Sequence, residues 1–196
     1  MLVDKESVFI YKMLTYWRYF VVMDQPVQDA IERRRSIREF TGEPVARELL
    51  HKIVRAGIWA PSGLNNQPWR FVLIRDKETG QRLATLTKYA HIVREAPALI
   101  AVYLDQAAMY NPMKDYQSAG AAIQNMLLAA EELGLGAVWL GQILQNSNEV
   151  NALLKLDGTF ELMAVLAIGY PRHRKQQSQR KPLADFILHE IEGDHQ

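Results

Sequence analysis

The sequence predicts one α+β domain in which helices cover both faces of a central sheet. Two apolar runs, 98–104 and 162–169, show little alternation between apolar and polar residues. Strands of this kind are buried on both faces, so helices must lie above and below the sheet. A wide apolar stripe over 119–133 is typical of a long helix that packs against such a sheet.

The composition is that of a globular protein. Of the 196 residues, 48% are hydrophobic and 23% are charged, which excludes wholesale disorder. The formal net charge is +1, so no overall field favours nucleic acid or an anionic membrane. The absence of cysteine excludes disulfides, thiolate nucleophiles and cysteine-bound metals. A cysteine-free chain is compatible with a reducing compartment, and we expect a cytoplasmic protein.

Residues 1–22 differ from the rest of the chain. They are aromatic and apolar, but charged residues interrupt them before the roughly 20 apolar residues that span a bilayer are reached. We therefore predict no membrane span, an N-terminal extension at 1–23 and one domain at 24–196. Three interpretations of the extension stay open: a packing helix, a membrane-surface contact, or an upstream extension of a reading frame that starts at Met23. The weak basic bias favours the first and third.

The other elements follow in chain order. Helices are predicted from 26 into an arginine-rich stretch, at 49–58, at 76–89 with a turn at Gly80, at 119–133 and around 148–156; strands are predicted at 71–74, 98–104, 137–141 and 162–169. Gly57 and Pro61 end the second helix, and Gly134 caps the fourth. Residues 105–116 look irregular.

The arginine-rich stretch is the first candidate for chemistry. It reads Arg33-Arg34-Arg35-Ser36-Ile37-Arg38, with four arginines in six residues. The planar guanidinium fork suits phosphate, and a serine hydroxyl adds a short donor. Alone, such a run is as often a solvated helix face.

A second polar stretch follows, Pro61-Ser62-Gly63-Leu64-Asn65-Asn66-Gln67-Pro68-Trp69. It has three side-chain amides between two prolines, which stiffen it. Amides both donate and accept, so they can recognise the edge of a heterocycle. The plain alternative is an ordinary turn between a helix and a strand. A phosphorylated flavin requires both kinds of group: cations that bind its phosphate and amides that hydrogen-bond to the edge of its ring.

The two stretches together resemble the signatures of the FMN-dependent nitroreductase family, and the resemblance extends over about 26–187. It implies a nitroreductase-like fold, with a mostly antiparallel sheet sandwiched by helices and an intertwined homodimer that holds two FMN sites at its interface. It also implies NADH or NADPH as electron donor and a small oxidised acceptor such as a nitroaromatic or a quinone. The mechanism would be ping-pong, with hydride passing through flavin N5.

The resemblance assigns residues to FMN. Arg34 and Ser36 are expected at the phosphate and ribityl chain, and Arg35 either at the ribityl chain or in solvent. Arg38 is expected at the N1–O2 edge of the ring, where a fixed cation stabilises the negative charge of the reduced flavin. No side chain is marked as a catalytic acid, and no metal is expected because the histidines show no ligand spacing.

The second stretch is expected to reach the FMN bound mainly by the other subunit. The residues carried over are Pro61, Ser62, Gly63, Asn65 and, less firmly matched, Gln67. Trp69 is expected to pack in the interior.

Two later segments complete the expected site. Leu140 and Gly141 would offer backbone groups near N5 and O4. The family usually closes the phosphate site with Lys-x-Arg before Pro-Leu. Here Arg180 matches, but Ser178 replaces the lysine, so the grip is weaker unless a neighbouring lysine substitutes.

Two alternatives stay open. The same fold also serves a flavin-fragmenting dimethylbenzimidazole synthase and reductive dehalogenases, which usually add lid elements; this chain offers only 105–116 for that purpose. The other alternative is a flavin-binding protein without enzyme activity. A nucleic-acid partner is not expected, because the basic tail lacks interleaved aromatics and any recognised motif.

Overall fold

The computed structural model describes residues 26–192. The extension predicted at 1–23 lies outside these residues. The centre of the fold is a four-stranded sheet in the order β1-β2-β4-β3, in which neighbouring strands are antiparallel. The strands are β1 (Trp69–Ile74), β2 (Ala98–Asp105), β3 (Gly136–Leu140) and β4 (Phe160–Gly169). All four predicted strands are present.

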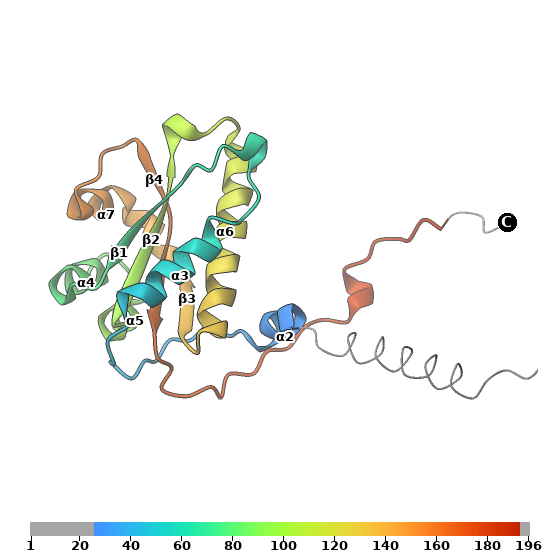
Figure 1. Cartoon of the computed structure of the whole chain (residues 1–196), viewed down its shortest axis with the longest axis horizontal. Coiled ribbons are helices and arrows are strands. Elements are labelled where there is room, and N and C mark those ends of the chain that lie inside the picture. The colour runs from blue at the N-terminus through green and yellow to red at the C-terminus, as the bar shows by residue number, and fades with distance from the viewer. Residues whose placement is uncertain (1–25, 193–196) are drawn as a thin grey trace, which may run out of the picture.

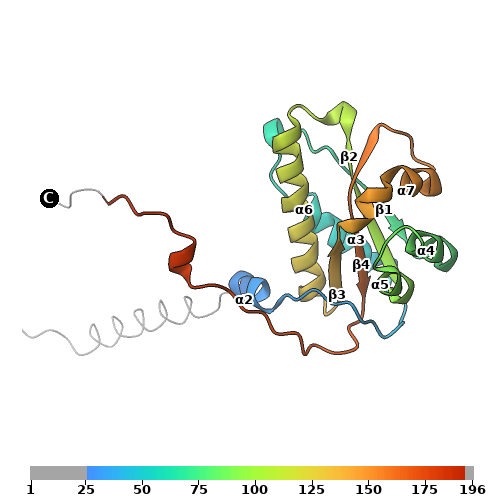
Figure 2. The ribbon, with the colours of Figure 1, turned by 180° about the vertical axis from the view of Figure 1, so that it is seen from behind.

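Helices cover both faces of the sheet, as the apolar runs predicted. α3 (Arg47–Gly57) and α6 (Pro112–Glu132) pack on one face, and α4 (Lys77–Ala84), α5 (Ala90–Glu95) and α7 (Ser147–Leu154) pack on the other (Figures 1 and 2). β2 is buried along nearly its whole length. The short α2 (Pro26–Arg33) stands at the C-terminal end of α6 (Figure 1). The expected α+β sandwich is confirmed.

The helix predicted over 76–89 is partly wrong. Only α4 lies in this range and it ends at Ala84, a second helix starts at Ala90, and Gly80 lies inside α4 and not in a turn. A distant side chain makes the break: Gln142 Oε1 accepts from Thr87 Oγ1 at 2.8 Å and from Lys88 N at 2.7 Å. A tertiary contact of this kind leaves no local signal in the sequence.

The prediction that 105–116 is irregular is also partly wrong, because α6 begins at Pro112. The Asn111 side chain caps the helix by accepting from Lys114 N at 3.1 Å, and proline suits the first helical turn. Gly134 follows the C-terminal end of α6 and has a φ of +74°, the left-handed conformation typical of a glycine that caps a helix, as predicted. In residues 26–192 no helix is long and apolar enough to cross a membrane.

After β4 the chain first follows the body and then leaves it. Pro171 forms an isolated antiparallel β-bridge with Phe40, and Arg174 forms an ion pair with Glu131 of α6 at 2.6 Å. The tail then runs away from the sheet (Figures 1 and 2). Its large apolar side chains are exposed: Leu183, Phe186, Ile187, Leu188 and Ile191.

Candidate functional site: an arginine segment and an amide loop

The arginine segment, Arg34–Arg38, lies across the end of the sheet beside β3. Ser36 forms a parallel bridge with Ala137, and Ile37 N donates to Ala137 O at 3.0 Å. Ile37 is buried against Gly136: a Cβ on that glycine would lie 2.7 Å from Ile37 Cβ. The close approach therefore requires glycine and fixes the segment to the sheet.

The guanidinium groups of this segment have no acidic partner among residues 26–192. Arg34 and Arg35 are half-buried, and the Nε atom of each is buried without a hydrogen bond. Arg38 is exposed, and its Nη1 donates to Ser36 O at 3.3 Å. Half-buried cations without a carboxylate suit an anionic ligand such as a phosphate group.

The amide loop, Pro61–Gln67, holds an unusual backbone. Leu64, Asn65 and Gln67 have φ values of 54°, 55° and 46°. The left-handed region costs a residue with a Cβ about 1–2 kcal/mol, and asparagine tolerates it best. Ser62 Oγ closes the loop by accepting from Gln67 N at 3.1 Å. Strain of this kind persists only where the surroundings hold it in place.

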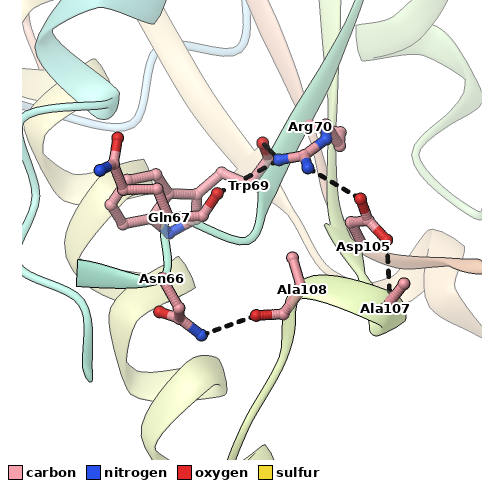
Figure 3. Close-up of polar contacts among 7 residues, drawn as sticks. All are labelled: Asn66, Gln67, Trp69, Arg70, Asp105, Ala107 and Ala108. Carbon is pink, nitrogen blue, oxygen red and sulfur yellow. Dashed lines mark hydrogen bonds and ion pairs between the residues drawn. The ribbon is translucent and has the colours of Figure 1, made fainter. Parts of the chain in front are cut away.

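Helix α6 supplies two of the groups that hold the loop. Ser118 Oγ donates to Pro61 O at 2.9 Å, and Asp115 Oδ1 accepts from Asn66 Nδ2 at 2.8 Å. Asn66 Nδ2 also donates to Ala108 O at 3.0 Å (Figure 3). Sequence reasoning missed Asp115 and Ser118. The available signal was their spacing, which places both on the N-terminal continuation of the apolar stripe of α6.

The other side of the loop is tied to β1 and β2. Arg70 and Asp105 form an ion pair at 2.7 Å, and Arg70 Nη1 donates to the carbonyls of Gln67 and Trp69 at 3.2 and 2.8 Å (Figure 3). Asp105 Oδ1 accepts from Ala107 N at 3.1 Å. Trp69 is buried, as predicted.

Gly63 is a second position of close approach. A Cβ there would clash with the ring of Tyr110 unless that ring moved. The Lys114 ammonium lies 5.5 Å from the centre of the same ring, within cation–π range. The ring of Tyr110 thus covers the beginning of the amide loop.

Two tyrosines have pKa values above the ordinary value. Burial raises the pKa of Tyr103 to about 12. The hydrogen bond from Tyr116 to Glu161, 3.0 Å to Oε1, raises the pKa of Tyr116. The expectation that no side chain acts as general acid remains a prediction.

In one chain the two candidate stretches lie at opposite ends of α6. The amide loop is bonded to Asp115 and Ser118 near its start, whereas Arg33 and Glu132 line one groove at its end. With a rise of 1.5 Å per residue, these ends are about 25 Å apart. The structure therefore does not bring the amide loop to the arginine segment within one chain (Figure 2).

The remaining predicted residues lie apart from both. Leu140 is buried, and Gly141 is exposed with open space where a Cβ would be. Gly141 follows Ala137 by four residues, about 13 Å along the strand. Arg180 hydrogen-bonds within the tail, to Ser178 and to Gln179 O.

Comparison with known proteins gives consistent results. The model of the nitroreductase family matches residues 31–88 and 81–170. A protein of Methanothermobacter thermautotrophicus, provisionally named NADH dehydrogenase/NAD(P)H nitroreductase, is 35% identical over 76% of this chain and 80% of its own. An FMN reductase [NAD(P)H] of Bacillus subtilis is 30% identical over 76% of this chain and 67% of its own.

Among solved structures, a protein of Desulfovibrio desulfuricans in complex with FMN is 50% identical. It covers 87% of this chain and 99% of its own, with a TM-score of 0.82. The chain belongs to the nitroreductase family, which confirms the resemblance seen in the two stretches.

Proposed function

We propose that this protein is an FMN-dependent oxidoreductase that takes reducing equivalents from NADH or NADPH and passes them to a small oxidised acceptor. The observation that carries the proposal is the arginine segment, whose guanidinium groups lack acidic partners within residues 26–192. When bound, FMN supplies the hydride chemistry, and the protein supplies binding, orientation and electrostatics.

The arginine segment is the phosphate half of the site. Arg34 and Ser36 bind the phosphate and ribityl chain, and Arg35 contributes a further cation. Arg38 would face the N1–O2 edge of the ring, where a fixed cation would stabilise negative charge. The unpartnered Nε atoms of Arg34 and Arg35 support this assignment.

The amide loop serves the FMN of the other subunit through Pro61, Ser62, Gly63, Asn65 and Gln67. The separation of about 25 Å along α6 supports a site built by two chains, since neither chain alone joins the two halves. Exposed apolar side chains near α6 support the same homodimer: Val27, Ile31, Ile58 and Trp59, the last 82% exposed.

The backbone of Leu140 and Gly141 approaches the ring, and the open space at Gly141 favours that contact. Arg180 of the tail completes the phosphate grip, with Ser178 in the place of the family's lysine. The exposed tail, 175–192, reaches over the partner subunit in this arrangement.

The acceptor is a nitroaromatic, a quinone or a similar flat oxidised molecule. Nicotinamide and acceptor would bind at the same site in turn, so the kinetics would be ping-pong. No side chain is assigned as the proton donor, and the proton that accompanies reduction comes from solvent.

The absorption spectrum of the purified protein tests the proposal. We expect bound flavin, anaerobic bleaching by NADH or NADPH, and recovery of the spectrum on addition of a quinone or nitroaromatic. Colourless protein that takes up no FMN contradicts it. Flavin reduced by dithionite but by neither nicotinamide indicates a flavin-binding protein, and dimethylbenzimidazole formed from reduced FMN in air indicates the flavin-fragmenting reaction.

A further inference from the structure

Among residues 26–192, two side chains that are charged, or polar without an aromatic ring, are buried. Both lie on helix α6. Asp115 is 0% exposed and Ser118 is 5% exposed. The residues that follow on the same face are apolar: Ala119, Ala122, Ile123 and Met126. A buried carboxylate is costly unless hydrogen bonds satisfy it, so its position calls for a reason beyond packing.

The bonds of the Asp115 carboxylate are divided between the segment just before α6 and the amide loop. Oδ2 accepts from Tyr110 N at 3.1 Å and from Asn111 N at 2.9 Å, which fixes the carboxylate at the start of α6. Oδ1 accepts from Asn66 Nδ2 at 2.8 Å. The carboxylate therefore joins a rigid helix to one side chain of the amide loop.

The two α6 contacts bracket the part of the loop that is assigned to the flavin. Ser118 binds the carbonyl of Pro61 at its start, and Asp115 binds Asn66 near its end. Asn65 lies between them with a positive φ of 55°. Leu64 beside it is 85% exposed, so packing of its side chain does not hold this backbone.

We infer that Asp115 and Ser118 are positioning residues that hold the strained amide loop, and Asn65 above all, in the conformation that binds FMN. The inference rests on the proposed function. Neither side chain touches the flavin in this account; each acts through the loop. Pre-organisation of this kind strengthens binding, because the loop does not have to be ordered when the ligand arrives.

FMN affinity and stability of the apoprotein, measured side by side, test the inference. We expect Asp115→Asn, Asn66→Ala and Ser118→Ala each to weaken FMN binding about tenfold, the effect of losing one hydrogen bond to a charged or strained group. Asn66→Ala leaves the carboxylate with both of its backbone donors, Tyr110 N and Asn111 N, so this variant serves if Asp115→Asn does not fold.

Asn151→Ala is the matched control. Asn151 Nδ2 donates to Phe160 O at 2.9 Å, a comparable bond from a half-buried amide on α7, across the sheet from α6. We expect it to lower the melting temperature of the apoprotein and to leave the FMN dissociation constant unchanged. If the α6 variants behave like Asn151→Ala, the inference is wrong.

A double-mutant cycle with Asn65→Ala separates positioning from a general loss of stability. In the wild-type background Asn65→Ala weakens FMN binding; in the Asp115→Asn background we expect most of that loss to be absent, because Asn65 is already displaced. Additive losses contradict the inference. A wild-type protein that binds no FMN contradicts the proposed function instead, so the two failures are distinguishable.

Discussion

At the scale of single residues, charge and the space around glycine define the candidate site. Arg34, Arg35 and Arg38 hold like charges close together without a carboxylate partner in the described part of the chain. Like charges repel, so the segment is best satisfied by a multivalent anion. Ile37 between them is buried and anchors the segment to Gly136.

Arg38→Gln tests the role of the exposed cation. Loss of a charged contact worth about 1.4 kcal/mol lowers the two-electron midpoint potential of bound FMN by about 30 mV, because negative charge on the reduced ring is less stabilised. A dye-equilibrated reductive titration measures the shift. Arg33→Gln is the control, because Arg33 precedes the arginine segment Arg34–Arg38 and is not assigned to FMN. An equal shift of the midpoint potential in both variants excludes a special role for Arg38.

Gly136→Ala tests the anchoring of the arginine segment. The new methyl group would lie 2.7 Å from Ile37 Cβ, and overpacking of this kind costs about 1–3 kcal/mol of unfolding free energy. We expect lower stability in urea and weaker FMN binding. Gly158→Ala has no atom within 4 Å of the new methyl group and serves as the control; equal behaviour of the two variants contradicts the account.

At the scale of elements, the sheet and its two helical layers follow from apolar pattern, whereas the loops depend on side-chain contacts between elements. Gln142 ends the helical region before α5, and Arg70 ties the amide loop to Asp105. The end of α7 is a plain local feature. Lys155 caps it with φ 58° and ψ 39°, a conformation that favours glycine.

Lys155→Gly should stabilise the protein. Removing the left-handed penalty of about 1–2 kcal/mol outweighs the extra backbone entropy of glycine, about 0.5–1 kcal/mol, and the net gain is about 0.5–1 kcal/mol. Urea unfolding of the apoprotein measures it. Lys155→Ala keeps the penalty and should bring no gain, and FMN affinity should be unchanged in both because α7 lies across the sheet from α6. A loss of stability in Lys155→Gly contradicts the argument.

At the scale of the whole molecule, the arrangement of α6 decides how many chains build one site. Its length separates the arginine segment from the amide loop, and the proposed symmetric dimer would join the halves twice. The apolar side chains exposed on the tail and beside α6 are the surfaces that such a dimer would bury.

Mixed dimers test this arrangement. One chain carries Arg34→Ala and Arg38→Ala, and the other carries Ser62→Ala and Asn65→Ala, with different affinity tags for purification of the mixed species. If each site takes its two halves from different chains, one site of each mixed dimer is intact, and FMN content is about half that of the wild type. If one chain builds a whole site, the mixed dimers bind no FMN. Homodimers of each variant are the controls.

The sequence by itself determined the layers and the family. The unbroken apolar runs of β2 and β4 require cover on both faces, and hydrophobic burial is a property of the residues, whatever their partners. Two local stretches, Arg34–Arg38 and Pro61–Trp69, were sufficient to identify the nitroreductase family, because each combines unusual residue types in a fixed order.

Only the tertiary structure decided how those stretches are placed and held. It ended the helix predicted over 76–89 at Ala84, extended α6 back to Pro112, and put the two stretches at opposite ends of α6. It also identified Asp115 and Ser118, two polar side chains buried under the loop. Contacts between residues some 50 positions apart leave no periodic signal in a sequence, since they depend on packing in three dimensions.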